Sequence, residues 1–359
     1  MSETATPTDG SAVDTLWYTR CPVPTPLGLA AQLGWISEEF KPDGIGIKTL
    51  QDSNDSNLRE SHFDHHLINS FRYGGNVPAI WARANGRDTK VIGINWIDEY
   101  QAILALPDSG IRAPKDLRGR KLGLPVHQGS IDFQRAGALR GFIVALELAG
   151  LAHKDAEFID LPASAWQNSQ VDPRVPTSGA PTGWSNTGIY TAELYALVRG
   201  DVDAIYVKGA HGAQLAQQLR AYVVTDISRH PDPIARTNNS APRPLTVDSE
   251  ILRNRPDLVA RFLARVEAIG AWAAEHPAEA VAYIARETGS TEQWVRYAYG
   301  QDVHKRLDTN LDEIAVAGLN AYKNFLLQWG FLKADFDARA WIDPQPLADI
   351  HKYASKKTA

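Results

Sequence analysis

The runs KLGLP (121–125), FQRAGALRGFIVALELAG (133–150) and EFIDLP (157–162) decide the fold class. The first and third runs are short and rich in strand-forming residues, whereas the middle run has the length and apolar content of a buried helix. A strand, a helix and a second strand in this order are typical of a βαβ unit in a parallel sheet. The sequence therefore predicts an α/β protein.

The same alternation of strand and helix patterns extends outward on both sides of this unit. Upstream, the predicted elements are the strand LWYTR (16–20), a helix over 27–40, the strand IGIKTL (45–50), a helix over 78–84 and the strand VIGINWI (91–97). Downstream, AELYALVRG (192–200) predicts a helix and DAIYV (203–207) a strand. Two α/β units are therefore expected.

The last third of the chain has a different pattern. Residues 250–289 and 311–332 carry helical apolar spacing, and the Pro- and Asn-rich connector 229–247 ends in a short strand. We predict a first lobe from 13–100 plus 225–359, with the C-terminal helices, and a second lobe from 101–224. Residues 1–12 are expected to be disordered. The ligand is expected in a cleft between the lobes, with the long irregular stretch 163–188 over it.

Composition excludes several classes of protein. Cys21 is the only cysteine among 359 residues, so neither an internal disulfide nor an iron–sulfur or zinc-ribbon site can form, and a reducing compartment is expected. No apolar run is long enough to cross a membrane, and the first residues lack the pattern of an export signal, which favours a cytoplasmic protein. The net charge of −5 is spread among both signs, so neither nucleic acid nor a membrane surface is an expected partner. A small-molecule ligand is expected, and the protein is expected to be a monomer.

Cys21 follows the predicted strand 16–20 directly and opens a Cys-Pro-Val-Pro segment. The prolines Pro22 and Pro24 prevent the strand ladder from continuing, so the thiol is placed at a strand's carboxyl end. A buried, inert cysteine is the alternative, because free cysteine is among the most buried residue types. A reactive thiolate would need a nearby cation.

Three histidines stand close together at positions 62, 65 and 66. A metal site, a polar surface segment and a catalytic role for His62 alone are the possibilities that the sequence leaves open. The zinc-helix pattern needs a glutamate directly after the first histidine, and this chain has Phe63 there. We therefore predict no metal.

Arg72 is followed by an aromatic residue and the pair Gly74 and Gly75, which leads into the predicted helix at 78. Backbone N–H groups at a helix start form an anion cradle, and an arginine beside it can bind two oxygens at once. An ordinary turn with a solvated arginine is the alternative. Further candidates for ligand contact are Arg135 on the second-lobe helix and the tryptophans Trp96 and Trp184.

The motifs around Cys21, His62 and Arg72 together resemble those of a known family of enzymes. Arg-Cys-Pro-Val-Pro at 20–24, His62-Phe63, and Arg72 followed by aromatic-Gly-Gly resemble the site of the aryl-sulfinate desulfinases. That family lies within the periplasmic-binding-protein-like group of sulfonate-, nitrate- and taurine-binding proteins, so the resemblance implies a two-lobed fold of that type. It also implies that Cys21, His62, Arg72 and Gly75 form a sulfinate site. Segments 127–145 and 163–190 would line the organic end of the ligand.

The chemistry that the resemblance implies is cofactor-free cleavage of the C–S bond of an organic, aromatic sulfinate with release of sulfite. Arg72 and the Gly75 N–H would hold the sulfinate oxygens. Cys21 would either attack the sulfur or deliver a proton to the ipso carbon, and His62 would orient the cysteine or adjust its proton affinity. Two alternatives remain: a non-catalytic transporter-type binding protein for a sulfonate-like anion, and a protein like thiamine-pyrimidine synthase, which shares the fold.

Overall fold

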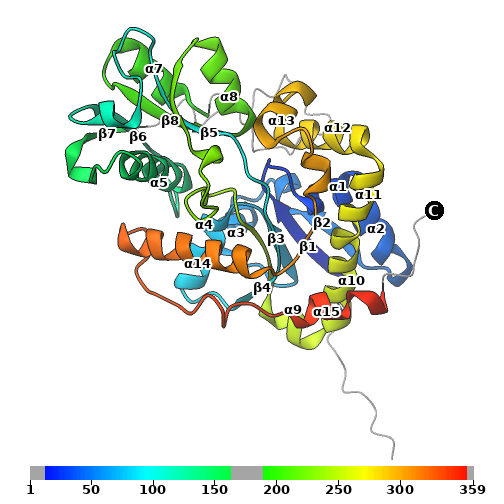
Figure 1. The fold of residues 1–359 in the computed structure, drawn as a ribbon. Coiled ribbons are helices and arrows are strands. Elements are labelled where there is room, and N and C mark those ends of the chain that lie inside the picture. The colour runs from blue at the N-terminus through cyan, green and yellow to red at the C-terminus, as the bar shows by residue number, and fades with distance from the viewer. Residues whose placement is uncertain (1–12, 163–188, 354–359) are drawn as a thin grey trace, which may run out of the picture.

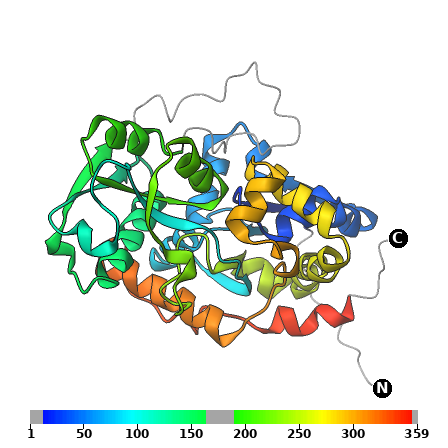
Figure 2. The same ribbon diagram turned by 45° about the horizontal axis from the view of Figure 1, so that its top comes forward.

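The computed structural model describes residues 13–162 and 189–353, which form two five-stranded sheets. Helices cover both sheets, and the two α/β units lie side by side (Figures 1 and 2). The expectations for 1–12 and 163–188, and with them Trp184, lie outside the described residues. The predicted α/β architecture with two lobes is confirmed.

The first sheet has the order β2-β1-β3-β10-β4. Its strands are β1 (Thr15–Arg20), β2 (Gly46–Thr49), β3 (Ser70–Tyr73), β4 (Thr89–Asn95) and β10 (Arg243–Asp248). Strand β1 is parallel to both β2 and β3, so the carboxyl ends of these three strands meet at one edge. Strand β3 is buried along its whole length. It was not predicted, because it is only four residues long and the glycine pair that follows it resembles a turn.

The second sheet has the order β7-β6-β8-β5-β9. Its strands are β5 (Gln101–Ala105), β6 (Lys121–Val126), β7 (Glu157–Pro162), β8 (Ala204–Lys208) and β9 (Tyr222–Asp226). The division at 100/101 and 224/225 stays a prediction, and β9 extends two residues past the second boundary.

The sheets are mixed. The predicted parallel pairing is present between β6 and β7 and between β1 and its neighbours β2 and β3, whereas two strands run in the opposite direction. Strand β10 is antiparallel to β3 and β4, and β5 is antiparallel to β8 and β9. Both exceptional strands directly follow a crossing of the chain from one sheet to the other, from β4 to β5 and from β9 to β10. A strand that enters from the other unit need not follow the direction that βαβ crossovers impose.

The helices predicted over 27–40 and 78–84 are present and begin slightly earlier, at Pro26 and Asn76, whereas the helix Ser56–Asp64 was not among the predicted elements. The predicted helix over 27–40 is two helices, since Gly34 between them adopts a left-handed backbone with φ +78°. The helices up to the crossover connection are α1 (Pro26–Gln32), α2 (Trp35–Phe40), α3 (Ser56–Asp64), α4 (Asn76–Ala84), α5 (Phe133–Glu147), α7 (Thr191–Arg199) and α8 (Gly209–Gln218).

The C-terminal third is helical, as predicted, and its helices contact both units. Its helices are α9 (Ser249–Asn254), α10 (Pro256–Glu267), α11 (Ile269–Glu275), α12 (Pro277–Thr288), α13 (Glu292–Tyr299), α14 (Glu313–Gln328) and α15 (Gln345–Asp349). Helix α10 packs through Phe262 on Phe71 of β3, with ring centroids 3.8 Å apart. Helix α14 runs along the side of both units (Figure 1), and Phe325 stacks under Arg140 of α5.

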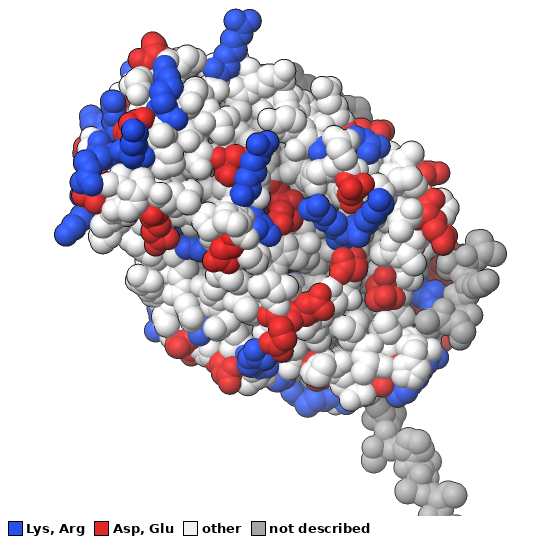
Figure 3. All heavy atoms as spheres, in the orientation of Figure 1, with Lys and Arg blue, Asp and Glu red and all other residues white. Residues whose placement is uncertain are grey.

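Charged side chains of both signs are interspersed on the face shown in Figure 3. No helix in the described ranges is long and apolar enough to span a membrane.

Candidate active site

Cys21 lies at the carboxyl edge of the first sheet, one residue after β1. Its backbone N–H donates to the Tyr73 carbonyl at 3.2 Å, which extends the ladder between β1 and β3 to the cysteine itself. The side chain is partly exposed. Ligands of open α/β sheets bind at this edge, so the strand positions the only thiol of the chain where a ligand is expected.

The glycine pair after β3 leaves room for the sulfur and supplies a donor to it. A Cβ atom at Gly74 would lie 2.3 Å from Cys21 Sγ, so a side chain at this position would displace the sulfur. Gly75 is the N-cap of α4, and its N–H donates to Sγ at 3.3 Å. The positive end of the helix dipole therefore faces the sulfur, a placement that favours negative charge there.

Asn239, from the connector between β9 and β10, fixes this turn from the other side. Its carbonyl accepts from the Asn76 N–H at 2.7 Å, and its side-chain oxygen accepts from the Val77 N–H at 3.2 Å. The first N–H groups of α4 are thus engaged, while the Gly75 N–H is directed at the thiol. Sequence analysis missed Asn239, because it is more than 160 residues away along the chain.

Arg72 is fully buried in β3, which excludes the solvated turn that the sequence left open. Its Nε donates to the His62 carbonyl and its Nη1 to the Gly75 carbonyl, each at 2.8 Å. Its Nη2 points to Cys21 Sγ at 3.9 Å. Two sides of the guanidinium therefore hold the backbone of neighbouring site residues, and the third faces the sulfur.

His62 projects from the last turn of α3 and is almost fully buried. Its Nε2 lies 3.6 Å from Cys21 Sγ, and its Nδ1 lies 2.7 Å from Thr19 Oγ1. Burial, and then the charge of Arg72, keeps the pKa of His62 well below the usual value, so the ring is neutral at pH 7. A neutral imidazole has one N–H donor and one acceptor nitrogen.

The other two histidines of the cluster face different partners. His65 lies 3.3 Å from the Ser70 carbonyl and 3.3 Å from Thr246 Oγ1, and His66 pairs with Asp64 at 2.6 Å. Among the residues that the structure describes, no group of three metal-ligating side chains converges. The structure thus brings His62 alone to the cysteine.

Two polar residues behind His62 belong to the site and were not predicted. Thr19 lies in β1 two residues before Cys21, where the β1–β3 ladder still continues, so the alternation of extended side chains could have placed both on one face. Gln51, in the short 3₁₀ turn Leu50–Asp52 after β2, donates through Nε2 to Thr19 Oγ1 at 2.8 Å. Both side chains are buried.

Contacts from the second unit reach the outer face of α3. Phe63 stacks on Phe133 at the start of α5, with ring centroids 6.4 Å apart, and Ser130 donates a hydrogen bond to Glu60. The site therefore lies beside the boundary between the two units.

Arg135 and Trp96 have partners of their own. Arg135 pairs with Asp160 at 2.8 Å, and the Trp96 indole N–H donates to Asp98 at 3.0 Å. Neither residue has a described contact with Cys21, His62 or Arg72, and their assignment to ligand binding stays a prediction.

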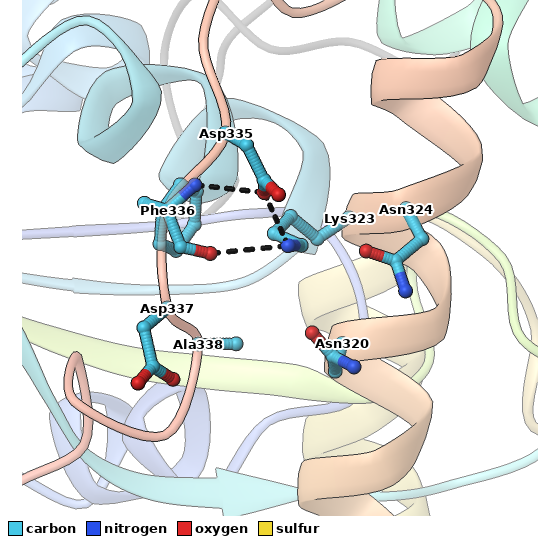
Figure 4. A pocket seen from close by; sticks show the side chains of 7 residues that line it. All are labelled: Asn320, Lys323, Asn324, Asp335, Phe336, Asp337 and Ala338. Carbon is cyan, nitrogen blue, oxygen red and sulfur yellow. Dashed lines mark hydrogen bonds and ion pairs between the residues drawn. The ribbon is translucent and has the colours of Figure 1, made fainter.

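A hollow of about 470 Å³ in the described part of the chain has none of the site residues in its lining (Figure 4). It lies between α14 and the segment 335–338, where Lys323 binds Asp335 and the Phe336 carbonyl. The lysine is thus already neutralised, and the Asp337 carboxylate that also lines the hollow accepts from the backbone N–H groups of Arg339 and Ala340.

The chain was compared with known proteins. No known family profile matches it. A 2'-hydroxybiphenyl-2-sulfinate desulfinase of Rhodococcus erythropolis is 27% identical over 94% of this chain and 93% of its own length, and the enzyme of Rhodococcus qingshengii is equally similar. Among solved structures, one is a cysteine-to-serine mutant of the desulfinase DszB in complex with biphenyl-2-sulfinic acid. It superposes on this chain with a TM-score of 0.74, and the two sequences are 27% identical over 95% of this chain and 99% of that one. The resemblance to sulfinate desulfinases is confirmed.

Likeness to transport proteins concerns the fold alone. The periplasmic aliphatic sulphonate binding protein SsuA of Escherichia coli has a TM-score of 0.64 at 15% identity, over 92% of each chain. This structure confirms the predicted periplasmic-binding-protein-like fold.

Proposed function

We propose that this protein is a desulfinase that cleaves the C–S bond of an organic, aromatic sulfinate and releases sulfite. The observation that carries the proposal is the environment of Cys21, where His62, Arg72 and the Gly75 N–H surround the only thiol of the chain. The similarity to enzymes named for this activity extends over nearly the whole chain, and one solved relative holds an aryl sulfinic acid.

The net reaction balances with water as the only co-reactant. A sulfinate and water give the arene and hydrogen sulfite, so we class the enzyme as a cofactor-free C–S bond hydrolase. We further propose that it acts as a monomer, which sedimentation of the purified chain tests.

Two routes use the same residues. In the first, the Cys21 thiolate attacks the sulfinate sulfur, the C–S bond breaks, and the arene takes a proton; water then attacks the Cys–S–SO₂⁻ adduct, which releases hydrogen sulfite and restores the cysteine. In the second, the Cys21 thiol protonates the ipso carbon and the C–S bond breaks; water captures the sulfur dioxide, and a proton returns to the thiolate. In both routes, N–H donors stabilise the negative charge around the two sulfur atoms.

The test is sulfite release from a panel of aryl and alkyl sulfinates by the wild type and Cys21→Ser. In D₂O, the arene product should carry one deuterium at the ipso carbon. His66→Gln is a matched control, because His66 belongs to the same cluster but faces Asp64. Sulfite from the wild type and His66→Gln, with none from Cys21→Ser, supports the proposal. No sulfite from any sulfinate, with thermal stabilisation by sulfonates, would instead establish a binding protein.

A further inference from the structure

The polar side chains behind His62 form a chain of hydrogen bonds with a defined direction. It runs from Gln51 through Thr19 and His62 to Cys21, and its first three side chains are at most 3% exposed. Water therefore has little access to these groups, and the donor and acceptor roles along the chain follow from the partners that the protein supplies.

The direction starts at the Arg20 carbonyl. The same Gln51 amide atom lies 2.7 Å from this carbonyl and 2.8 Å from Thr19 Oγ1. A carbonyl oxygen only accepts, so this atom must be the NH₂ group, and it donates to both. The other end of the amide agrees, because Thr49 Oγ1 accepts from the Gln51 backbone N–H and donates to Gln51 Oε1.

Thr19 transmits this direction to the histidine. Its hydroxyl accepts from Gln51, and its other hydrogen-bond partner among the described residues is His62 Nδ1 at 2.7 Å, so the buried hydroxyl hydrogen is donated to this nitrogen. A nitrogen that accepts a hydrogen bond carries no proton, and in a neutral ring the proton is then on Nε2. Nε2 is the atom that faces Cys21 Sγ at 3.6 Å.

We propose that Gln51 and Thr19 are positioning residues that fix the Nε2–H tautomer of His62, so that His62 donates a hydrogen bond to the Cys21 sulfur instead of accepting its proton. This inference rests on the proposed desulfinase function for its catalytic consequence, whereas the tautomer itself does not depend on the substrate. It removes one role for His62, because Nε2 cannot act as a base toward the thiol while it carries a proton.

The sulfur then faces donors on three sides within the described residues: His62 Nε2–H, the Gly75 N–H and Arg72 Nη2. Such surroundings match a sulfur with negative charge, which is a hydrogen-bond acceptor, better than a thiol that must donate.

The direct test is to measure which ring nitrogen of His62 is protonated, by long-range ¹H–¹⁵N NMR of the full chain. Comparison with the spectrum of His62→Gln assigns the His62 signals among those of the ten histidines. The wild type is expected to show a bare Nδ1 and a protonated Nε2. A proton on Nδ1 in the wild type would overturn the inference, whether or not the protein cleaves sulfinates.

Gln51→Glu should reverse the direction of the hydrogen bonds from residue 51 through Thr19 to His62, which we call the relay. A carboxylate accepts from the Thr19 hydroxyl, which then accepts from His62, so the proton should appear on Nδ1. Nδ1 without a proton in this variant would contradict the proposed relay. Thr19→Val and Thr19→Ser give a second test if Gln51→Glu does not fold, because the valine removes the hydroxyl and the serine retains it.

Alkylation by iodoacetamide measures how the His62 tautomer affects the reactivity of Cys21 in the absence of substrate. At neutral pH, the alkylation rate and the kcat of Thr19→Val should both be about tenfold to a hundredfold lower than those of the wild type, which is the effect of losing a hydrogen bond to a charged group. KM should be unchanged. Thr19→Ser should be close to the wild type in both rates. Thr237→Val is the matched control, since it removes an equally buried hydroxyl that binds the Ile234 carbonyl. Equal rates for Thr19→Val and Thr237→Val would refute the relay and leave Thr19 a purely structural role.

Discussion

His65 should make the fold sensitive to mild acid. Burial lowers its pKa from about 6.5 to about 4, with smaller effects of the same sign from Arg72 and Arg87 and opposite effects from the Ser70 carbonyl and Asp64. A histidine with a lowered pKa in the folded state binds its proton more readily when the chain is unfolded. It therefore favours unfolding as the pH falls below about 6.5, and this effect levels off below about 4.

The two pKa values set the size of the effect. At pH 7 the difference in proton binding reduces the free energy of unfolding by well under about 1 kcal/mol, whereas at pH 5 the reduction reaches about 2 kcal/mol. His65→Asn removes the titrating group and keeps a residue type that tolerates the left-handed backbone at this position, where φ is +52°.

Urea unfolding of the wild type and His65→Asn at pH 8, 7 and 5 measures this contribution. Between pH 7 and pH 5, the wild type should lose about 2 kcal/mol more than the variant, because all other groups titrate in both proteins. Between pH 8 and pH 7, the two should respond alike, which controls for general effects of the substitution. Equal losses between pH 7 and pH 5 would show that His65 takes up its proton without disturbing the fold.

Three further predictions concern the site. Cys21→Ser should abolish sulfite release but retain sulfinate binding, measured by calorimetry; more than a small residual rate would remove the thiol from the chemistry. Arg72→Lys should lower kcat/KM at least about tenfold and also lower Tm, because an ammonium cannot keep both backbone carbonyl bonds of the guanidinium; an unchanged Tm would contradict their structural role. Gly74→Ala should lower kcat, since its Cβ would lie 2.3 Å from the sulfur, whereas Gly46→Ala in β2, whose Cβ would come no closer than 3.5 Å to another atom, should not; equal kinetics would refute the steric argument.

The fold was predictable where elements have local signals. The apolar runs that became β1, β6 and β8, the long apolar helix α5 and the periodic helix α14 need no distant contact to be recognised. Strand β3 escaped prediction because its Ser-Phe-Arg-Tyr sequence contains a cation, and only the completed sheet shows that the cation is buried. The direction of β10 was equally hidden, since it depends on where the chain returns from the other unit.

The site was predictable as residue types but not as hydrogen bonds. Cys21, His62, Arg72 and Gly75 could be selected from their spacing and resemblance, yet the partners of Arg72 are backbone carbonyls, which leave no mark in a sequence. Thr19 had a usable signal in strand alternation with Cys21. Gln51 had none, because it reaches Thr19 only after β2 pairs with β1.

The arrangement also changes how an anionic substrate can be held. The sequence predicted that Arg72 binds two oxygens with its fork, but Nε and Nη1 already bind carbonyls, so Nη2 is the part that faces the reacting sulfur. At 3.9 Å this nitrogen is too far for a strong hydrogen bond to Sγ, and it has two N–H bonds, so an incoming oxygen can bind to it without displacing the cysteine. The sulfur itself is held by the nearer Gly75 N–H and by His62. A negatively charged ligand oxygen and the cysteine sulfur can therefore be held side by side, because each has its own hydrogen-bond donors.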